Sequence, residues 1–104
     1  MLLWSERLYI SEPLLKKSEK IKKKLSQGRR VHDIFLITGP TNGENLFEVI
    51  ESKELLFPYH KRREIPVYGL AKGKEDALEL VRTIIEDIYR ETGGLCSKEY
   101  FAKP

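Results

Sequence analysis

The chain has 104 residues, 40% of them apolar, and a formal net charge of +3 at pH 7. That apolar content suffices for one small core but not for two, so we expect a single domain over residues 1–104. Apolar runs are far shorter than the roughly 20 residues that cross a bilayer, and the single cysteine, Cys96, excludes an intramolecular disulfide. These features predict a cytoplasmic protein that does not enter the membrane.

Positive charge is concentrated in two clusters along the chain. Residues 16–30 carry eight Lys or Arg side chains against the single Glu19, a net charge of +7, and residues 61–63 add three more cations. Basic clusters of this kind bind anionic partners, either nucleic acid or an acidic protein surface. A solvated helix face has the same pattern, so both interpretations stay open.

The first third of the chain predicts a short strand and a basic helix. Residues 7–10 have a strand-like composition. Ser11 and Pro13 are typical of a helix start, and Gly28 is typical of a helix end, so we expect a basic helix within residues 14–30. Its lysines surround a narrow apolar stripe made of Leu14, Ser18, Ile21 and Leu25.

The middle of the chain predicts three strands. Residues 31–38 and 45–53 are rich in β-branched and aromatic residues, and the turn formers between them indicate a β-hairpin. Residues 34–37 are apolar on both faces, which is typical of a strand inside a sheet. Residues 65–70 have the composition of a third strand.

Residues 74–92 have the most regular helical pattern, with apolar side chains at three- and four-residue spacing. Glu75 and Asp76 suit the positive end of the helix dipole, and Gly93 with Gly94 ends the helix. Six acids against three cations give this helix a net charge of −3.

Together these elements predict an α+β fold in the order (β)αβββα, with a small, mainly antiparallel sheet of three to four strands and two helices packed on one face. The other face would then need a second chain to cover it, because residues 34–37 are apolar on both sides. The sequence therefore predicts a homodimer.

Two glycine-containing segments invite comparison with anion-binding loops. ITGPTNGEN, residues 37–45, is not a phosphate-binding P-loop, because its last glycine is followed by Glu44 and not by Lys, and its Asn-Gly pair favours a hairpin turn. Lys72, Gly73 and Lys74 offer a better anion-binding site, since they precede a helix whose N-terminal amides attract anions. An ordinary strand-to-helix connection would have the same composition.

Nucleic-acid binding would use the basic helix and the loop at residues 59–63. In that loop one aromatic ring could stack on a base while three neighbouring cations contact phosphates. An ordinary exposed loop is the other interpretation. The candidate residues are Lys20, Lys23, Lys24, Arg29, Arg30, Tyr59, Lys61, Arg62 and Arg63.

One group of residues could be catalytic. With the hairpin turn centred near Asn42, antiparallel pairing places Asp33 opposite Glu51 and puts Lys53 on the same face. This arrangement resembles the metal site of restriction-endonuclease-like nucleases, which implies two carboxylates that hold Mg²⁺ and a lysine that assists the attacking water. The alternative is a solvated hairpin base with an Asp33 to Lys53 ion pair, and a one-residue change of register would separate the carboxylates.

The segments FLITGPTNGENLF and VYGLAKGKEDALELVRTIIEDIYRETGG resemble small proteins of gut-dwelling and related Gram-positive bacteria that have no assigned activity. The resemblance implies a compact bacterial domain, and it implies no catalytic residue, metal or cofactor. Our leading hypothesis is therefore a non-enzymatic interaction or regulatory module that forms a homodimer. Nucleic-acid binding is the second hypothesis, and a metal-dependent nuclease is the third.

Overall fold

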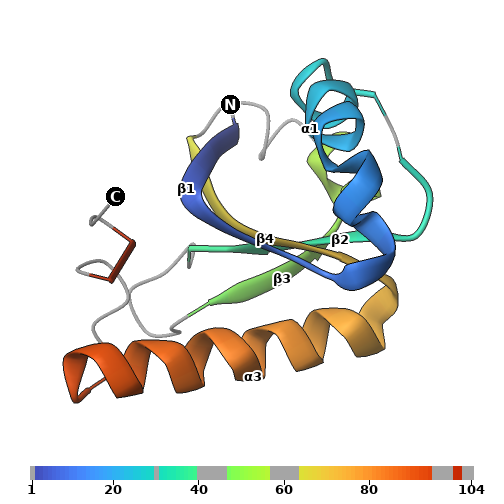
Figure 1. The fold of residues 1–104 in the computed structure, drawn as a ribbon. Helices are drawn as coiled ribbons and strands as arrows, with labels where there is room; N and C mark the ends of the chain where they lie inside the picture. The colour runs from blue at the N-terminus through green and yellow to red at the C-terminus, as the bar shows by residue number, and fades with distance from the viewer. Residues whose placement is uncertain (1, 30, 40–46, 57–63, 95–99, 102–104) are drawn as a thin grey trace.

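The computed structural model describes residues 2–29, 31–39, 47–56, 64–94 and 100–101. They form a four-stranded sheet with helices on both sides (Figure 1). The strands are β1 (Leu2–Ile10), β2 (Ile34–Thr38), β3 (Glu48–Glu51) and β4 (Ile65–Lys72). The helical elements are the 3-10 helix η1 (Glu12–Lys17), which leads directly into α1 (Ser18–Ser26), the 3-10 helix η2 (Ser52–Leu56) and the long helix α3 (Gly73–Thr92).

The sheet is mixed, with the strand order β1-β4-β2-β3. β2 runs antiparallel to both β3 and β4, whereas β1 runs parallel to β4. The α+β class is confirmed, but the expectation of a mainly antiparallel sheet missed this parallel edge. The short strand expected at residues 7–10 is the end of a nine-residue strand. Its pairing with β4 is irregular between Trp4 and Tyr9, where polar residues interrupt the apolar pattern that would have revealed it.

The two helices lie on opposite faces of the sheet, and the prediction of one shared face is wrong (Figure 1). Apolar residues of η1 and α1 form one buried cluster with Ile34 and Leu36 of β2. Ile37 of the same strand belongs to a second cluster, with Ile84 and Ile88 of α3. Successive side chains of a strand point to opposite faces, so one strand contributes to two cores.

Helices on both faces account for the apolar centre of β2. Ile34, Leu36 and Ile37 are each at most 3% exposed within a single chain. A second chain is therefore not needed to cover them, and the step that led from this strand to a homodimer is wrong. That step assumed that both helices would pack on the same side, whereas β2 presents apolar side chains to each of them.

The predicted basic helix is present, but it starts two residues earlier and ends four residues earlier than the expected 14–30, and it consists of two parts. Glu12–Lys17 form a 3-10 helix and Ser18–Ser26 an α-helix. Ser11 precedes them as expected, but its hydroxyl caps no helical amide. Its Oγ instead accepts a hydrogen bond from the backbone N–H of Lys72 at 3.1 Å, which connects the helix start to β4. The buried residues are those of the predicted apolar stripe: Leu14, Ile21 and Leu25.

α3 is the element closest to its prediction. It begins at Gly73 and ends at Thr92, within one residue of the expected start. Ile84 and Ile88 are fully buried against the sheet, and the chain leaves the helix at Gly93, whose φ of 74° is left-handed. In the described ranges, no helix is both long and apolar enough to span a membrane.

Candidate functional site

Asp33, one member of the predicted catalytic group, lies in the turn before β2. Its φ is 59°, which is uncommon for any residue except glycine but tolerated by Asp and Asn. Its backbone carbonyl accepts a hydrogen bond from the N–H of Gly73 at 2.9 Å. Its Oδ2 lies 3.8 Å from the position that a Cβ on Gly73 would occupy. Asp33 is therefore held at the junction of β4 and α3.

The register of the β2–β3 pair differs from the predicted one. Phe35, and not Asp33, lies opposite Glu51, so the pairing is centred on position 43 instead of 42. Pattern alone did not distinguish the two registers, because a two-residue shift keeps the same side chains on each face. The turn that was expected to set the register, around Asn42 and Gly43, lies outside the described residues.

Glu51 and Lys53 belong to the β3 side of β2. Lys53 Nζ lies 3.8 Å from Glu51 Oε1, so the lysine pairs with Glu51 and not with Asp33. β3 and β4 flank β2 on opposite sides, so Asp33 and Glu51 lie toward different neighbours of the strand. No group of three or more His, Cys, Asp or Glu side chains that could hold a metal ion occurs among the described residues. The observed geometry lends no support to a nuclease site.

The predicted anion-binding residues, Lys72, Gly73 and Lys74, do connect a strand to a helix, but two of their amides are already used. The Lys72 N–H donates to Ser11 Oγ, and the Gly73 N–H donates to the carbonyl of Asp33. The carboxylate of Asp33 also lies beside Gly73, where it would repel an anion. These contacts favour the ordinary strand-to-helix connection.

The lysines of η1 and α1 form a surface that we call the basic face. Of these lysines, only Lys22 forms an ion pair with another described residue, Glu19, at 3.4 Å. The ammonium of Lys22 also lies 5.7 Å from the centroid of the Trp4 ring. Lys22 and Lys24 are half-buried, and the other four lysines are exposed. The basic face consists of Lys16, Lys17, Lys20, Lys22, Lys23 and Lys24.

Other residues proposed for nucleic-acid binding are only partly described. Arg29 follows α1 and is exposed. The basic face, with Arg29 at its end, is thus the part of this predicted interface that the structure describes. The remaining candidates lie outside the described residues: Arg30, Tyr59, Lys61, Arg62 and Arg63.

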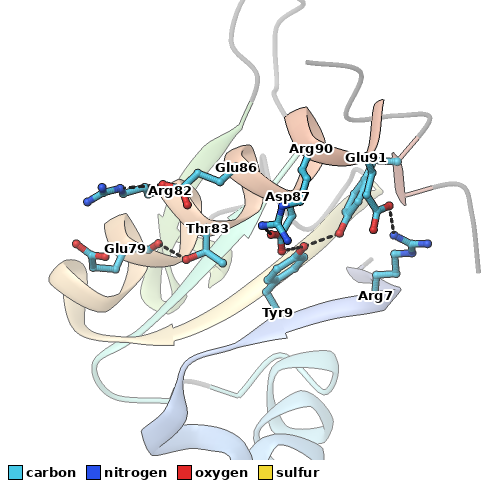
Figure 2. A network of polar contacts seen from close by, with 10 residues as sticks. Arg7, Tyr9, Glu79, Arg82, Thr83, Glu86, Asp87, Arg90 and Glu91 are labelled. Carbon is cyan, nitrogen blue, oxygen red and sulfur yellow. Dashed lines mark hydrogen bonds and ion pairs between the residues drawn. The ribbon is translucent and has the colours of Figure 1, made fainter. Parts of the chain in front are cut away.

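A polar network that the sequence did not predict joins β1 to α3 (Figure 2). The Tyr9 hydroxyl donates to Asp87 Oδ2 at 2.7 Å and lies 2.6 Å from the hydroxyl of Tyr100. Because the single hydroxyl hydrogen of Tyr9 is donated to Asp87, Tyr100 donates to Tyr9. Arg7 Nη1 donates to Glu91 Oε2 at 3.1 Å, and its guanidinium lies 4.7 Å from the centroid of the Tyr100 ring.

The pKa of Tyr9 reflects its place in this network. Burial raises the pKa of Tyr9, and the hydrogen bonds with Tyr100 and Asp87 raise it further. The phenol therefore stays protonated at neutral pH, and its hydroxyl connects β1 to α3 through hydrogen bonds. Tyr9 lies 78 positions from Asp87 and 91 from Tyr100, so no local sequence pattern could have revealed the contact.

A groove of about 450 Å³ lies between the start of η1 and the first turns of α3. Carboxylates of Glu12, Asp76 and Glu79 line it, together with the apolar side chains of Ile10 and Leu80. None of these three carboxylates forms an ion pair within the described part of the chain. The groove thus lies where the start of η1 meets the first turns of the acidic helix α3.

The surfaces on the two sides of the sheet differ in their charge. The predicted catalytic residues, by contrast, are not brought together in one group. The fold is a small α+β sheet with a basic helix on one face and an acidic helix on the other (Figure 1). Comparison with protein-family models, with curated proteins and with solved structures finds no match to this chain. A functional proposal for this protein therefore has to be based on the charge and exposure of these surfaces.

Proposed function

We propose that the protein is a non-enzymatic interaction module whose basic face binds an acidic protein surface. The observation that carries this proposal is that five of its six lysines form no ion pair within the described chain. The apolar residues of η1 and α1 already pack against the sheet, so the lysines are not required for the core. Like charges one turn apart on a helix destabilise it slightly, which is consistent with a role outside the chain.

One exposed apolar residue lies next to these cations. Leu15 of η1 is 56% exposed and directly precedes Lys16 in the chain. Protein interfaces typically combine an apolar centre with a polar or charged rim. An acidic surface that also carries an apolar side chain would match both features of the basic face.

Nucleic acid matches the described part of this face less well. Proteins that bind single strands use exposed aromatic rings on which bases stack. Trp4, the aromatic residue that contacts Lys22, donates its Nε1–H to Ser26 Oγ at 3.0 Å and packs against the core beneath α1. Its ring is therefore engaged within the protein and does not offer a stacking platform.

A binding assay with two defined probes tests the proposal. A labelled oligoglutamate peptide and a single-stranded DNA of equal formal charge are titrated with the protein, and fluorescence anisotropy yields the dissociation constants. The variant K20E/K23E reverses two exposed charges on the basic face, and K72E/K74E makes the same change at the β4–α3 junction. We expect K20E/K23E to weaken oligoglutamate binding about tenfold, since each exposed charge contact contributes up to about 1 kcal/mol.

The control variant K72E/K74E should bind oligoglutamate nearly as well as the wild type. Equal losses in the two variants would show that net charge, and not the basic face, attracts the peptide, which would contradict the proposal. Tighter binding to the DNA, with a steep decrease as salt is added, would instead assign the basic face to nucleic acid. Circular dichroism of both variants checks that their helices remain folded.

A further inference from the structure

We infer that the acidic partner is a second copy of this chain: the basic face of one copy docks on the acidic end of α3 in the next, so that copies associate head to tail. This inference rests on the proposed function and specifies its partner. The surface that would accept the basic face lies at the start of α3, on the opposite side of the sheet from α1.

The first turns of α3 carry carboxylates that no described cation pairs with. Glu75, Asp76 and Glu79 lie there, and Asp76 and Glu79 line the groove between η1 and α3. None of the three forms an ion pair among the described residues, whereas acids further along α3 do. We call these three residues the acidic face. With Lys74 beside them, they still leave a negative surface.

Each of the two faces also carries one exposed leucine. Leu15 on the basic side is 56% exposed, and Leu78 on α3 is 54% exposed. Leu78 lies between Glu75 and Glu79 in the sequence, as Leu15 lies beside the first lysines. The two faces therefore match in charge and also in having an apolar residue for the centre of a contact.

The positions of the faces decide the form of the assembly. The lysines of α1 and the carboxylates at the start of α3 belong to helices on opposite sides of the sheet, so a single partner copy cannot contact both (Figure 1). Each contact joins one basic face to one acidic face and leaves one face of each kind free. Such a heterologous contact produces chains or rings of copies and not a closed two-fold dimer. This proposed arrangement differs from the homodimer that the sequence predicted.

Salt must weaken this association, because both faces are exposed to solvent and their attraction is screened by ions. In sedimentation equilibrium at low salt, the average mass of the wild type should rise above the 12.2-kDa chain mass as protein concentration increases. The same samples at high salt should return to the mass of one chain.

Complementary variants provide the decisive experiment. K20E/K23E alters the basic face and keeps the acidic face, whereas E75K/E79K alters the acidic face and keeps the basic face. Each variant alone should sediment as a single chain. An equimolar mixture should form a complex of two chains that grows no further, because only one compatible pair of faces remains. A matched control, E6K/E64K, reverses two exposed glutamates elsewhere and should associate like the wild type.

Each outcome separates the inference from the proposed function. If the mixture stays at the mass of one chain while the wild type binds oligoglutamate through the basic face, head-to-tail association is wrong and the proposed function stands. If the wild type neither associates nor binds oligoglutamate, both are wrong. A wild-type mass that stops at two chains at every concentration would show a closed dimer and would overturn the head-to-tail arrangement.

Discussion

The helical segment η1–α1 and the helix α3 flank the same sheet, but their charges are compensated in different ways. On α3, Arg82 pairs with Glu86 at 3.1 Å and Arg90 pairs with Asp87 at 2.6 Å, so cations and acids one turn apart neutralise each other. On η1–α1, the six lysines have a single paired acid among the described residues, Glu19. The proposed interaction surface is therefore the helical segment whose charges are left without partners among the described residues.

The two segments also differ in how deeply they are buried. α3 has 20 residues, and its Ile84 and Ile88 are 0% exposed at the centre of one core. α1 has nine residues, and its Ile21 is 6% exposed. We therefore expect α3 to contribute more to the stability of the fold and η1–α1 to carry the unbalanced surface charge.

The largest expected effect tests this difference in burial with matched substitutions. Ile84→Ala should reduce the free energy of unfolding by about 3–5 kcal/mol and Ile21→Ala by about 2–3 kcal/mol, because a more enclosed site leaves a larger cavity. Urea denaturation followed by circular dichroism measures both. An equal or larger loss for Ile21→Ala would contradict the view that α3 dominates the stability of the fold.

A smaller effect tests the connection of α3 to β1. Tyr9→Phe removes the hydroxyl that bonds both Asp87 and Tyr100, and should reduce the free energy of unfolding by about 1–2 kcal/mol. Tyr89→Phe is the control, because Tyr89 is 62% exposed on the same helix and should change little. Urea denaturation at neutral pH compares the two variants.

The same substitution should change the response to alkaline pH. The pKa of Tyr9 is raised above its ordinary value of 10.0 in the folded state, so the folded protein holds this proton more tightly than the unfolded chain. Its contribution to stability is present below pH 10 and is lost as the pH rises above that value. The wild type should therefore lose stability above pH 10 more steeply than Tyr9→Phe. Parallel pH profiles for the two proteins would contradict this role.

The smallest effects compare single charges on the two segments. Arg82→Gln removes an ion pair from α3 and should lower stability by up to about 0.5 kcal/mol. Lys20→Gln relieves repulsion on the basic face and should be neutral or stabilising by about 0.3 kcal/mol. Thermal unfolding at low salt measures both changes, and high salt should reduce them. Loss of stability in Lys20→Gln would mean that the lysine has a partner within the chain.

Much of the fold could be predicted where the signal is local. The limits of α3 follow from apolar residues at helical spacing between Glu75 and Gly93, and the stripe of Leu14, Ile21 and Leu25 predicted which side of the basic helix is buried. These patterns are reliable because a helix satisfies its backbone hydrogen bonds within its own sequence.

The candidate site could be predicted less well, because it depends on contacts between distant segments. The register of β2 against β3 decided where Asp33 and Glu51 lie, and the sequence was compatible with more than one pairing. The hydrogen bond between Tyr9 and Tyr100 joins opposite ends of the chain, so no local sequence pattern indicates it. The composition of the basic face was predictable, whereas the finding that five of its six lysines form no ion pair with a described residue was not.

Composition and periodicity thus set the α+β class, the position of both helices and the strong positive charge of residues 16–30, because each depends on residues close together in the chain. Only the tertiary structure decided that the helices lie on opposite faces, that β1 runs parallel to β4 and which charges find partners. The physical reason is that a strand with apolar residues on both sides can accept a helix on either face. The choice is made by packing across the whole sheet.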